Sequence, residues 1–183
     1  MPAPDLARTA YAEGLPRAFA ELAAAHPEWS PRGHRGYAVV SGPHAALLRP
    51  LPTDDGELSL CRFENPDQAP DPQWALAVAA IRLGGAERLV RQCVQHLSRR
   101  KIQGRMTLAH PVVRAHVADS VLDLAEARQC LGSPGFDHMV DGVVRRSLRQ
   151  FGAAGYVDGP ARRLARALDL LSDVYREGAG DDR

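Results

Sequence analysis

Apolar residues recur at steps of three and four through residues 73–178, and this periodicity constrains the fold more than any other feature of the sequence. Four such runs follow one another, and each places its apolar residues on one helical stripe that another helix must cover. The runs are Val78, Ile81, Gly85, Leu89, Cys93 and Leu97; Val113, Val117, Val121, Leu124 and Leu131; Phe136, Val140, Val143, Leu148 and Phe151; and Leu164, Leu168, Leu171 and Tyr175. Segments rich in Gly and Pro separate them and end helices well. Because the connections are short, the sequence predicts an antiparallel, up-down four-helix bundle.

The first 70 residues predict a small α+β segment. Residues 4–25 form one or two short amphipathic helices in this interpretation. Their expected buried face is Leu6, Ala10, Leu15, Phe19 and Leu22. Short apolar runs at 37–40, 45–48 and 58–63, set between Gly, Pro and Asp turns, are typical of two or three β-strands. The Pro- and Asp-rich residues 64–72 mark a boundary, so we expect a mainly α chain in which residues 1–70 precede a bundle at 73–178.

Composition argues against several classes of function. The 23 Lys and Arg residues face 22 Asp and Glu residues, so no overall field draws the chain to nucleic acid or to an anionic membrane. The first residues contain no uninterrupted apolar segment of the kind found in a signal peptide or a membrane span. The three cysteines lack metal or redox spacing, which suits a reducing cytoplasm. The histidines form no pair with zinc-ligand spacing, so we expect no metal site.

Three segments of the predicted bundle carry a resemblance to the C-terminal domain of acyl-CoA dehydrogenases. The sequences RKIQG at 100–104, LAHPVV at 108–113 and AD at 118–119 are similar to that family's Arg-x-x-Phe-Gly turn, Leu-Ala-x-x-Gln stretch and Leu-Ala-Asp helix at the same spacing. The sequence FGAAGY at 151–156 is similar to its Gly-Gly-x-Gly-Tyr turn. A shorter match, YREG at 175–178, is similar to the Tyr-Glu-Gly that holds the catalytic base in many members. The predicted bundle at 73–178, in which these matches lie, is a little over half of the chain.

The resemblance implies a cofactor, FAD, and a set of site residues. In the family this domain helps to build a tetramer core, and its two turns reach the FAD of a neighbouring subunit. Arg100, Gln103 and Gly104 match the first turn, and Gly152 and Gly155 match the second. A guanidinium and the backbone N–H groups of a Gly-rich turn are well suited to a pyrophosphate. Glu177 matches the base, which would remove a proton α to the carbonyl of an acyl thioester.

The sequence also departs from the family. Gln103, Pro111, Ala153 and Ala167 stand where the family has Phe, Gln, Gly and Asp. Full members of the family also have an N-terminal helical domain and a β domain that holds the flavin. Residues 1–70 contain no matching flavin motif, and they could be a remnant of the β domain or an unrelated attachment. Plainer roles therefore stay open. Arg100 could cap a helix C-terminus within a basic cluster, Gly152 and Gly155 could simply turn the chain, and Glu177 could belong to a terminal tail.

Three functional alternatives follow. In the first, the chain is a truncated acyl-CoA dehydrogenase-like subunit, an FAD-dependent oxidoreductase only within a complex, which completes an FAD and acyl-thioester site with a fuller partner chain. In the second, the bundle is a non-catalytic scaffold, or a subunit that binds a small ligand or a protein and has lost flavin. The third, a helical transcription regulator, is disfavoured by the balanced charge and the lack of a recognition helix. The small residues on the helices favour a homo-oligomer.

Overall fold

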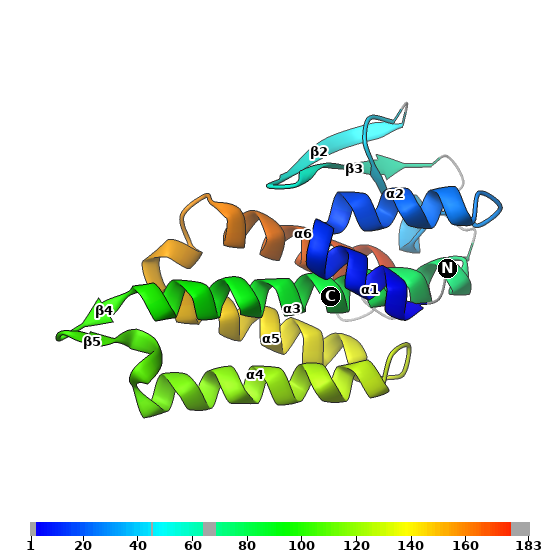
Figure 1. The fold of residues 1–183 in the computed structure, drawn as a ribbon. Coiled ribbons are helices and arrows are strands. Elements are labelled where there is room, and N and C mark those ends of the chain that lie inside the picture. Colours follow the sequence, from blue (N-terminus) through cyan, green and yellow to red (C-terminus); the bar gives the residue numbers. More distant parts are fainter. Residues whose placement is uncertain (1–2, 45, 64–68, 177–183) are drawn as a thin grey trace.

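The longest helix, α3 (Pro72–Arg99), runs through the centre of the molecule (Figure 1). This computed structural model describes residues 3–44, 46–63 and 69–176. The start of α3 is fixed by Asp71, whose carboxylate accepts hydrogen bonds from the backbone N–H groups of Gln73 (2.9 Å) and Trp74 (3.4 Å). Pro72 then occupies the first turn, where its missing N–H costs nothing.

Three further helices pack along α3 and complete the predicted bundle, α4 (Pro111–Gln129), α5 (Phe136–Phe151) and α6 (Pro160–Tyr175). The mainly α fold and the four helices are confirmed. The predicted stripes of α3, α5 and α6 are buried, but the stripe of α4 is wrong at Val121, which is 53% exposed. α4 packs against α3 and α5 through its buried residues Ser120, Leu124 and Ala127, of which Leu124 belongs to the predicted stripe, and Val121 lies outside this contact.

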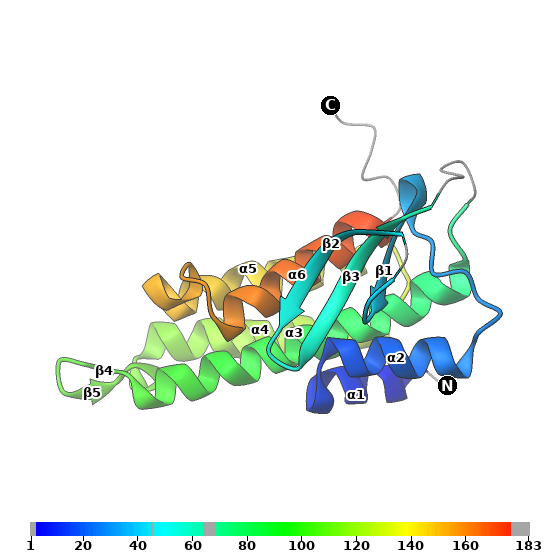
Figure 2. The same ribbon diagram turned by 90° about the horizontal axis from the view of Figure 1, so that it is seen from above.

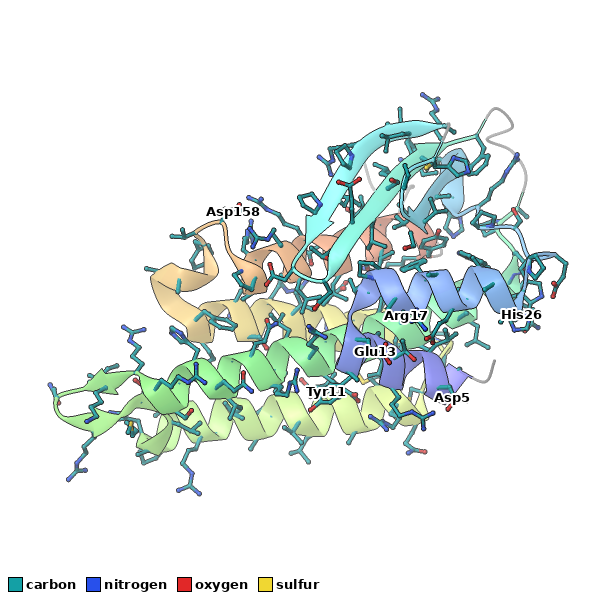
Figure 3. The ribbon with its side chains drawn as sticks, turned by 45° about the horizontal axis from the view of Figure 1, so that its top comes forward. Asp5, Tyr11, Glu13, Arg17, His26 and Asp158 are labelled. Atoms are coloured by element: carbon teal, nitrogen blue, oxygen red, sulfur yellow. The ribbon has the colours of Figure 1, made fainter. Side chains whose placement is uncertain are left out.

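Two short helices, α1 (Ala3–Glu13) and α2 (Leu15–Ala25), form the start of the chain, as the sequence predicts. Gly14 separates them with a φ of 99°, which side chains with a Cβ rarely adopt. All five apolar residues expected on their buried face have at most 1% exposure. Arg17 of α2 pairs with Glu13 of α1 (3.7 Å), and both residues are labelled in Figure 3. Arg17 also pairs with Glu21 of its own helix (2.9 Å).

The strands β1 (Tyr37–Ser41), β2 (Leu47–Thr53) and β3 (Gly56–Arg62) form an antiparallel sheet in the order β1-β3-β2. Its register pairs Val39 with Leu60 and Leu51 with Leu58. The second strand continues past the predicted residue 48 to Thr53, through Pro50 and Pro52, because an edge strand tolerates proline.

The sheet is joined to the helices by Tyr175, at the end of α6. The Tyr175 hydroxyl accepts hydrogen bonds from Val39 N (3.0 Å) and Trp74 Nε1 (3.3 Å) and donates one to Pro31 O (2.7 Å). One cluster of buried apolar side chains contains residues of α1, α2, the sheet and the bundle. The domain boundary at residues 64–72 stays a prediction, because residues 64–68 lie outside the described part of the chain. No helix in that part is long and apolar enough to cross a membrane.

Candidate functional site

The segment after α3 is a β-hairpin at the far end of the bundle (Figure 2). Strands β4 (Lys101–Ile102) and β5 (Arg105–Met106) are joined by Gln103 (φ 52°) and Gly104 (φ 79°). Positive φ at both central residues is typical of a type I′ turn, which suits the twist of a two-residue hairpin. Gln103 and Gly104 at the tip are exposed to solvent.

Arg100 lies at the base of this hairpin, and its backbone is fixed. The Arg100 carbonyl accepts hydrogen bonds from the backbone N–H (2.8 Å) and the hydroxyl (3.0 Å) of Thr107, which is buried. The guanidinium lies beside the turn that follows α5, since a Cβ built on Gly152 would be 3.3 Å from Arg100 Nη1. The fold therefore brings together two of the residues that the sequence singled out. We call Arg100, Gln103, Gly104 and Gly152 the hairpin-end cluster.

The two glycines of the second turn, η3 (Gly152–Gly155), are required by the backbone. Gly152 has φ 60° and ψ −138°, a conformation essentially confined to glycine. Gly155 is buried, and a Cβ there would lie 2.4 Å from the carbonyl oxygen of Leu148. Gly155 thus allows the turn to pack on the last turn of α5. Gly152, which has no Cβ, leaves the backbone beside Arg100 accessible.

The hairpin-end cluster has the chemistry of an anion site. The Arg100 side chain has no ion pair with any described carboxylate, and Arg99, Lys101 and Arg105 beside it are exposed. One turn earlier on α3 lies His96, which sequence reasoning missed. Its ring centroid is 5.2 Å from that of Phe151, and its buried Nε2 has no hydrogen-bond partner among the described residues. Since His96 shows no motif in the sequence, only the packing of α5 identifies it.

Glu177, the predicted base, lies outside the described residues, so its role stays a prediction. The structure does place the end of α6. Tyr175 bonds to Trp74 in the first turn of α3, whereas Arg100 follows the last turn of the same helix. A helix of 28 residues spans about 42 Å at 1.5 Å per residue. Tyr175 therefore lies at the opposite end of the bundle from the hairpin-end cluster, as the position of α6 in Figure 2 shows.

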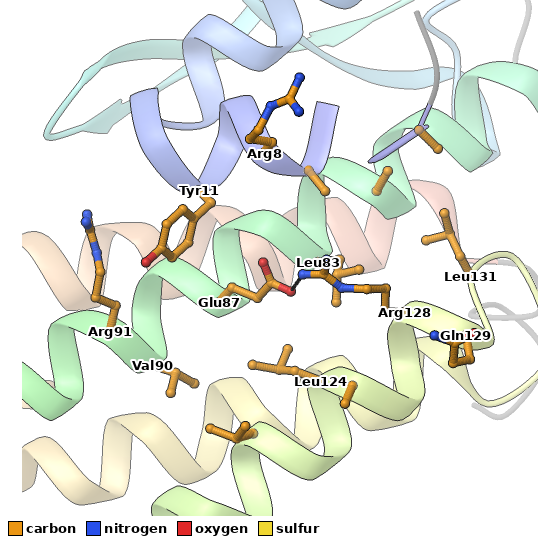
Figure 4. A pocket seen from close by; sticks show the side chains of 15 residues that line it. Arg8, Tyr11, Leu83, Glu87, Val90, Arg91, Leu124, Arg128, Gln129 and Leu131 are labelled. Carbon is orange, nitrogen blue, oxygen red and sulfur yellow. Dashed lines mark hydrogen bonds and ion pairs between the residues drawn. The ribbon is translucent and has the colours of Figure 1, made fainter. Parts of the chain in front are cut away.

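A second candidate region is a groove of about 880 Å³ over the middle of α3, between α1 and α4 (Figure 4). Its walls are mostly apolar, including Leu83, Val90 and Leu124. An ion pair joins Glu87 of α3 to Arg128 of α4 across the groove. At one end the guanidinium carbon of Arg91 lies 4.9 Å from the ring centroid of Tyr11.

A buried ionic cluster links α3 to α5 and α6. Arg82, only 3% exposed, pairs with Asp137 and also with Asp141 (2.8 Å). Asp141 in turn accepts a hydrogen bond from Ser172 (3.4 Å) and pairs with Arg176 (3.5 Å). The carboxylates neutralise a buried guanidinium, so we assign the cluster to helix packing. Across the described ranges, no group of three or more His, Cys, Asp or Glu residues could hold a metal ion.

Comparison with known proteins identifies the type of domain. Residues 74–133 match the family model of the acyl-CoA dehydrogenase C-terminal domain. The matched range contains Arg100, Gln103 and Gly104 but ends before Gly152 and Gly155. No curated protein matches the sequence.

Solved structures share the fold at low sequence identity. An acyl-CoA dehydrogenase from Geobacillus kaustophilus has 14% identity and a TM-score of 0.54, covering 76% of this chain and 45% of its own. A chain from the electron transferring flavoprotein study of Acidaminococcus fermentans has 18% identity and a TM-score of 0.53, covering 77% and 46%. Butyryl-CoA dehydrogenase from Megasphaera elsdenii has 15% identity and a TM-score of 0.50, covering 76% and 45%. This chain therefore spans less than half the length of the structures that it resembles.

Proposed function

We propose that this chain, whose helical bundle has the fold of the C-terminal domain of acyl-CoA dehydrogenases, completes an FAD and acyl-thioester site together with a fuller partner chain. The observation that carries the proposal is the position of Arg100 beside Gly152 at an exposed end of the bundle. A guanidinium without a carboxylate partner in the described structure, next to a backbone opened by a glycine, suits a pyrophosphate that approaches from outside.

The separation of the two ends of the bundle supports a shared site. The hairpin-end cluster follows α3, and the chain after Tyr175 begins about 42 Å away by the length of that helix. In this proposal, the flavin contacted by Arg100 of one copy therefore takes its base, Glu177, from another copy of this chain in the complex.

Within such a site, the residues would have distinct roles. Arg100 would bind a pyrophosphate oxygen, and Gly152 would let the backbone approach it. Gln103 and Gly104 would form the polar hairpin tip, while Gly155 would hold the second turn against α5. When bound, FAD would accept the hydride of the acyl thioester. The fit is incomplete at Gln103, because the family's Phe supplies an aromatic contact that an amide lacks.

Flavin content tests the role of Arg100. We would record the absorbance spectrum of the purified chain, alone and co-expressed with an acyl-CoA dehydrogenase-like chain encoded beside it. Flavin bands that appear only with the partner are expected. Arg100→Gln should lower the flavin retained by the complex, whereas the neighbouring exposed Arg99→Gln should not. Equal flavin content in both variants would remove Arg100 from the site.

Turnover tests the role of Glu177. Glu177→Gln removes the general base but keeps the shape of the side chain, so the complex should still bind an acyl thioester while flavin reduction stops. Retained reduction would exclude Glu177 as the base.

A second candidate is a flavin-free subunit that acts as a scaffold or binds another ligand. It is favoured by the polar tip at Gln103 and by the packing role of Gly155. A protein that stays colourless in both preparations would support this alternative over the first. In either case the predicted homo-oligomer can be tested by light scattering of the purified chain.

A further inference from the structure

The groove between α1 and α4 carries charges that are unequally paired. Its lining includes three arginines, Arg8, Arg91 and Arg128, and one carboxylate, Glu87. Arg8 is paired with Asp5 (2.5 Å), and Arg128 is paired with Glu87. Arg91 has no carboxylate within ion-pair distance in the described part of the chain. The groove is therefore apolar along its walls and positive at the end that Arg91 occupies.

The Arg91 end of the groove is held in place. The guanidinium carbon of Arg91 lies over the Tyr11 ring, 4.9 Å from its centroid, and this cation–π contact favours its position at this end. The backbone of α1 at this point is in turn held by Arg88, which donates to the carbonyl oxygens of Tyr11 (3.3 Å) and Ala12 (3.2 Å) and pairs with Asp55 (2.6 Å). Arg91 and Tyr11 thus present a guanidinium and a phenol hydroxyl at one end of the groove, and Leu131 lies at the other end (Figure 4).

We propose that this groove binds a fatty acid, with the carboxylate on Arg91 and Tyr11 and the hydrocarbon tail along the apolar wall toward Leu83. The volume of about 880 Å³ lies within the usual range for small-molecule pockets, which combine apolar walls with few polar groups. A carboxylate is the planar anion that a guanidinium binds best. From Arg91 to Leu83 the groove follows eight residues of α3, about 12 Å, which suits a medium-length tail.

The groove also explains an exposed residue that the fold leaves without cover. Val121 of α4 lines this groove and is 53% exposed. The exposed apolar surface of Val121 lies on the same wall of the groove as Ala125 and Leu124, and a hydrocarbon tail would bury it. The tail has to pass the Glu87–Arg128 pair, of which the Arg128 side chain is 60% exposed. The proposal requires no flavin and holds whichever function the hairpin-end cluster has.

Calorimetric titration of the delipidated, flavin-free full chain tests the proposal, with decanoate as the ligand and 1-decanol as its uncharged counterpart. We expect saturable binding of decanoate that is roughly tenfold tighter than binding of decanol, because one charge-assisted contact is worth about that factor. Arg91→Gln should remove the difference between the two ligands. The control Arg99→Gln, on the same helix but outside the groove, should keep it.

A second variant tests the location of the tail. Ala125→Trp places a large side chain on the wall of the groove and should abolish binding of both ligands. Circular dichroism checks that this variant folds. If it does not fold, the comparison of Arg91→Gln with Arg99→Gln decides the outcome. Absence of saturable decanoate binding, or binding that Arg91→Gln leaves unchanged, would overturn the proposal. A ligand-free dimer that Ala125→Trp dissociates but decanoate leaves intact would also overturn the proposal. In that case a second copy of the chain would occupy the groove.

Discussion

A Cβ atom built on Gly84 of α3 would lie 2.0 Å from the carbonyl oxygen of Ala7 in α1. The two helices therefore cross in direct backbone contact, and this contact sets the height of α1 above α3. The groove beside it, and the position of Tyr11 over Arg91, depend on that crossing.

Gly84→Ala should therefore destabilise the chain by about 1–3 kcal/mol, the usual cost of overpacking, because α1 has to move away from α3. Gly142→Ala is the matched control. Gly142 lies within α5, and nothing would lie within 4 Å of its added Cβ, so this change should be neutral or slightly stabilising. Urea denaturation of the two variants measures both effects, and equal effects would show that the crossing is looser than described.

Loss of the Arg82 guanidinium should be costly. Arg82→Met leaves Asp137 and Asp141 without their buried cation, and we expect a loss of about 3–5 kcal/mol in unfolding free energy. Arg128→Met removes an ion pair whose arginine is 60% exposed, and it should cost less than about 1 kcal/mol. If both variants lost the same stability, the buried cluster would not be a special contributor.

Removal of the Tyr175 hydroxyl should loosen the sheet from the bundle. Tyr175→Phe leaves the Val39 N–H and the Trp74 indole without their acceptor, and we expect a cost of about 1–3 kcal/mol. Hydrogen exchange of the Val39 amide should accelerate in the variant. Tyr156→Phe, at a tyrosine that is 64% exposed, serves as the control and should leave both quantities unchanged.

Stability should fall in alkaline solution. Burial raises the pKa of the Cys93 thiol to about 12, from an ordinary value of 9.0. The folded state then holds this proton more tightly than the unfolded state, so the stabilisation is complete below pH 9 and declines as the pH rises toward 12. One such group contributes a slope of about 1.4 kcal/mol per pH unit.

Urea unfolding at pH 8 and pH 10 measures this slope. Burial also raises the pKa of Tyr175, but ionisation of this phenol contributes to the pH dependence only above pH 10. Cys93→Ala should flatten the dependence, and Cys130→Ala, at the partly exposed end of α4, should retain the wild-type slope. Because burial also raises the pKa of Cys61, some slope should remain in Cys93→Ala. An unchanged slope in that variant would contradict the assignment.

The helices could be predicted because their apolar spacing is a local property. Asp71-Pro72 at the start of α3 and Gly14 between α1 and α2 are likewise local signals, readable from single residues. The stripe assigned to α4 was wrong at Val121, since the sequence does not show which helix lies at the edge of the bundle. Local periodicity fixes one apolar face but not how much of it a neighbour covers.

The candidate site was predictable only in part, because its residues meet through the packing of distant segments. The resemblance identified Arg100 and Gly152 as separate motifs, but their contact depends on how α5 lies against α3. The groove had no sequence signal at all. Arg91 and Tyr11 come from helices far apart in the sequence, which meet only through the packing of α1 on α3 around Gly84 and Arg88.

The prolines of β2 limit what the small sheet can become. Pro50 and Pro52 are two residues apart, so their missing N–H groups lie on the same side of the strand, and the residues between and beside them supply the ladder to β3. That outer side cannot donate to a further strand at these positions. Extension of the sheet along β2 is consequently disfavoured. A further strand, from this chain or from another, would find no N–H donor at Pro50 or Pro52, which opposes the edge-to-edge pairing that leads to aggregation.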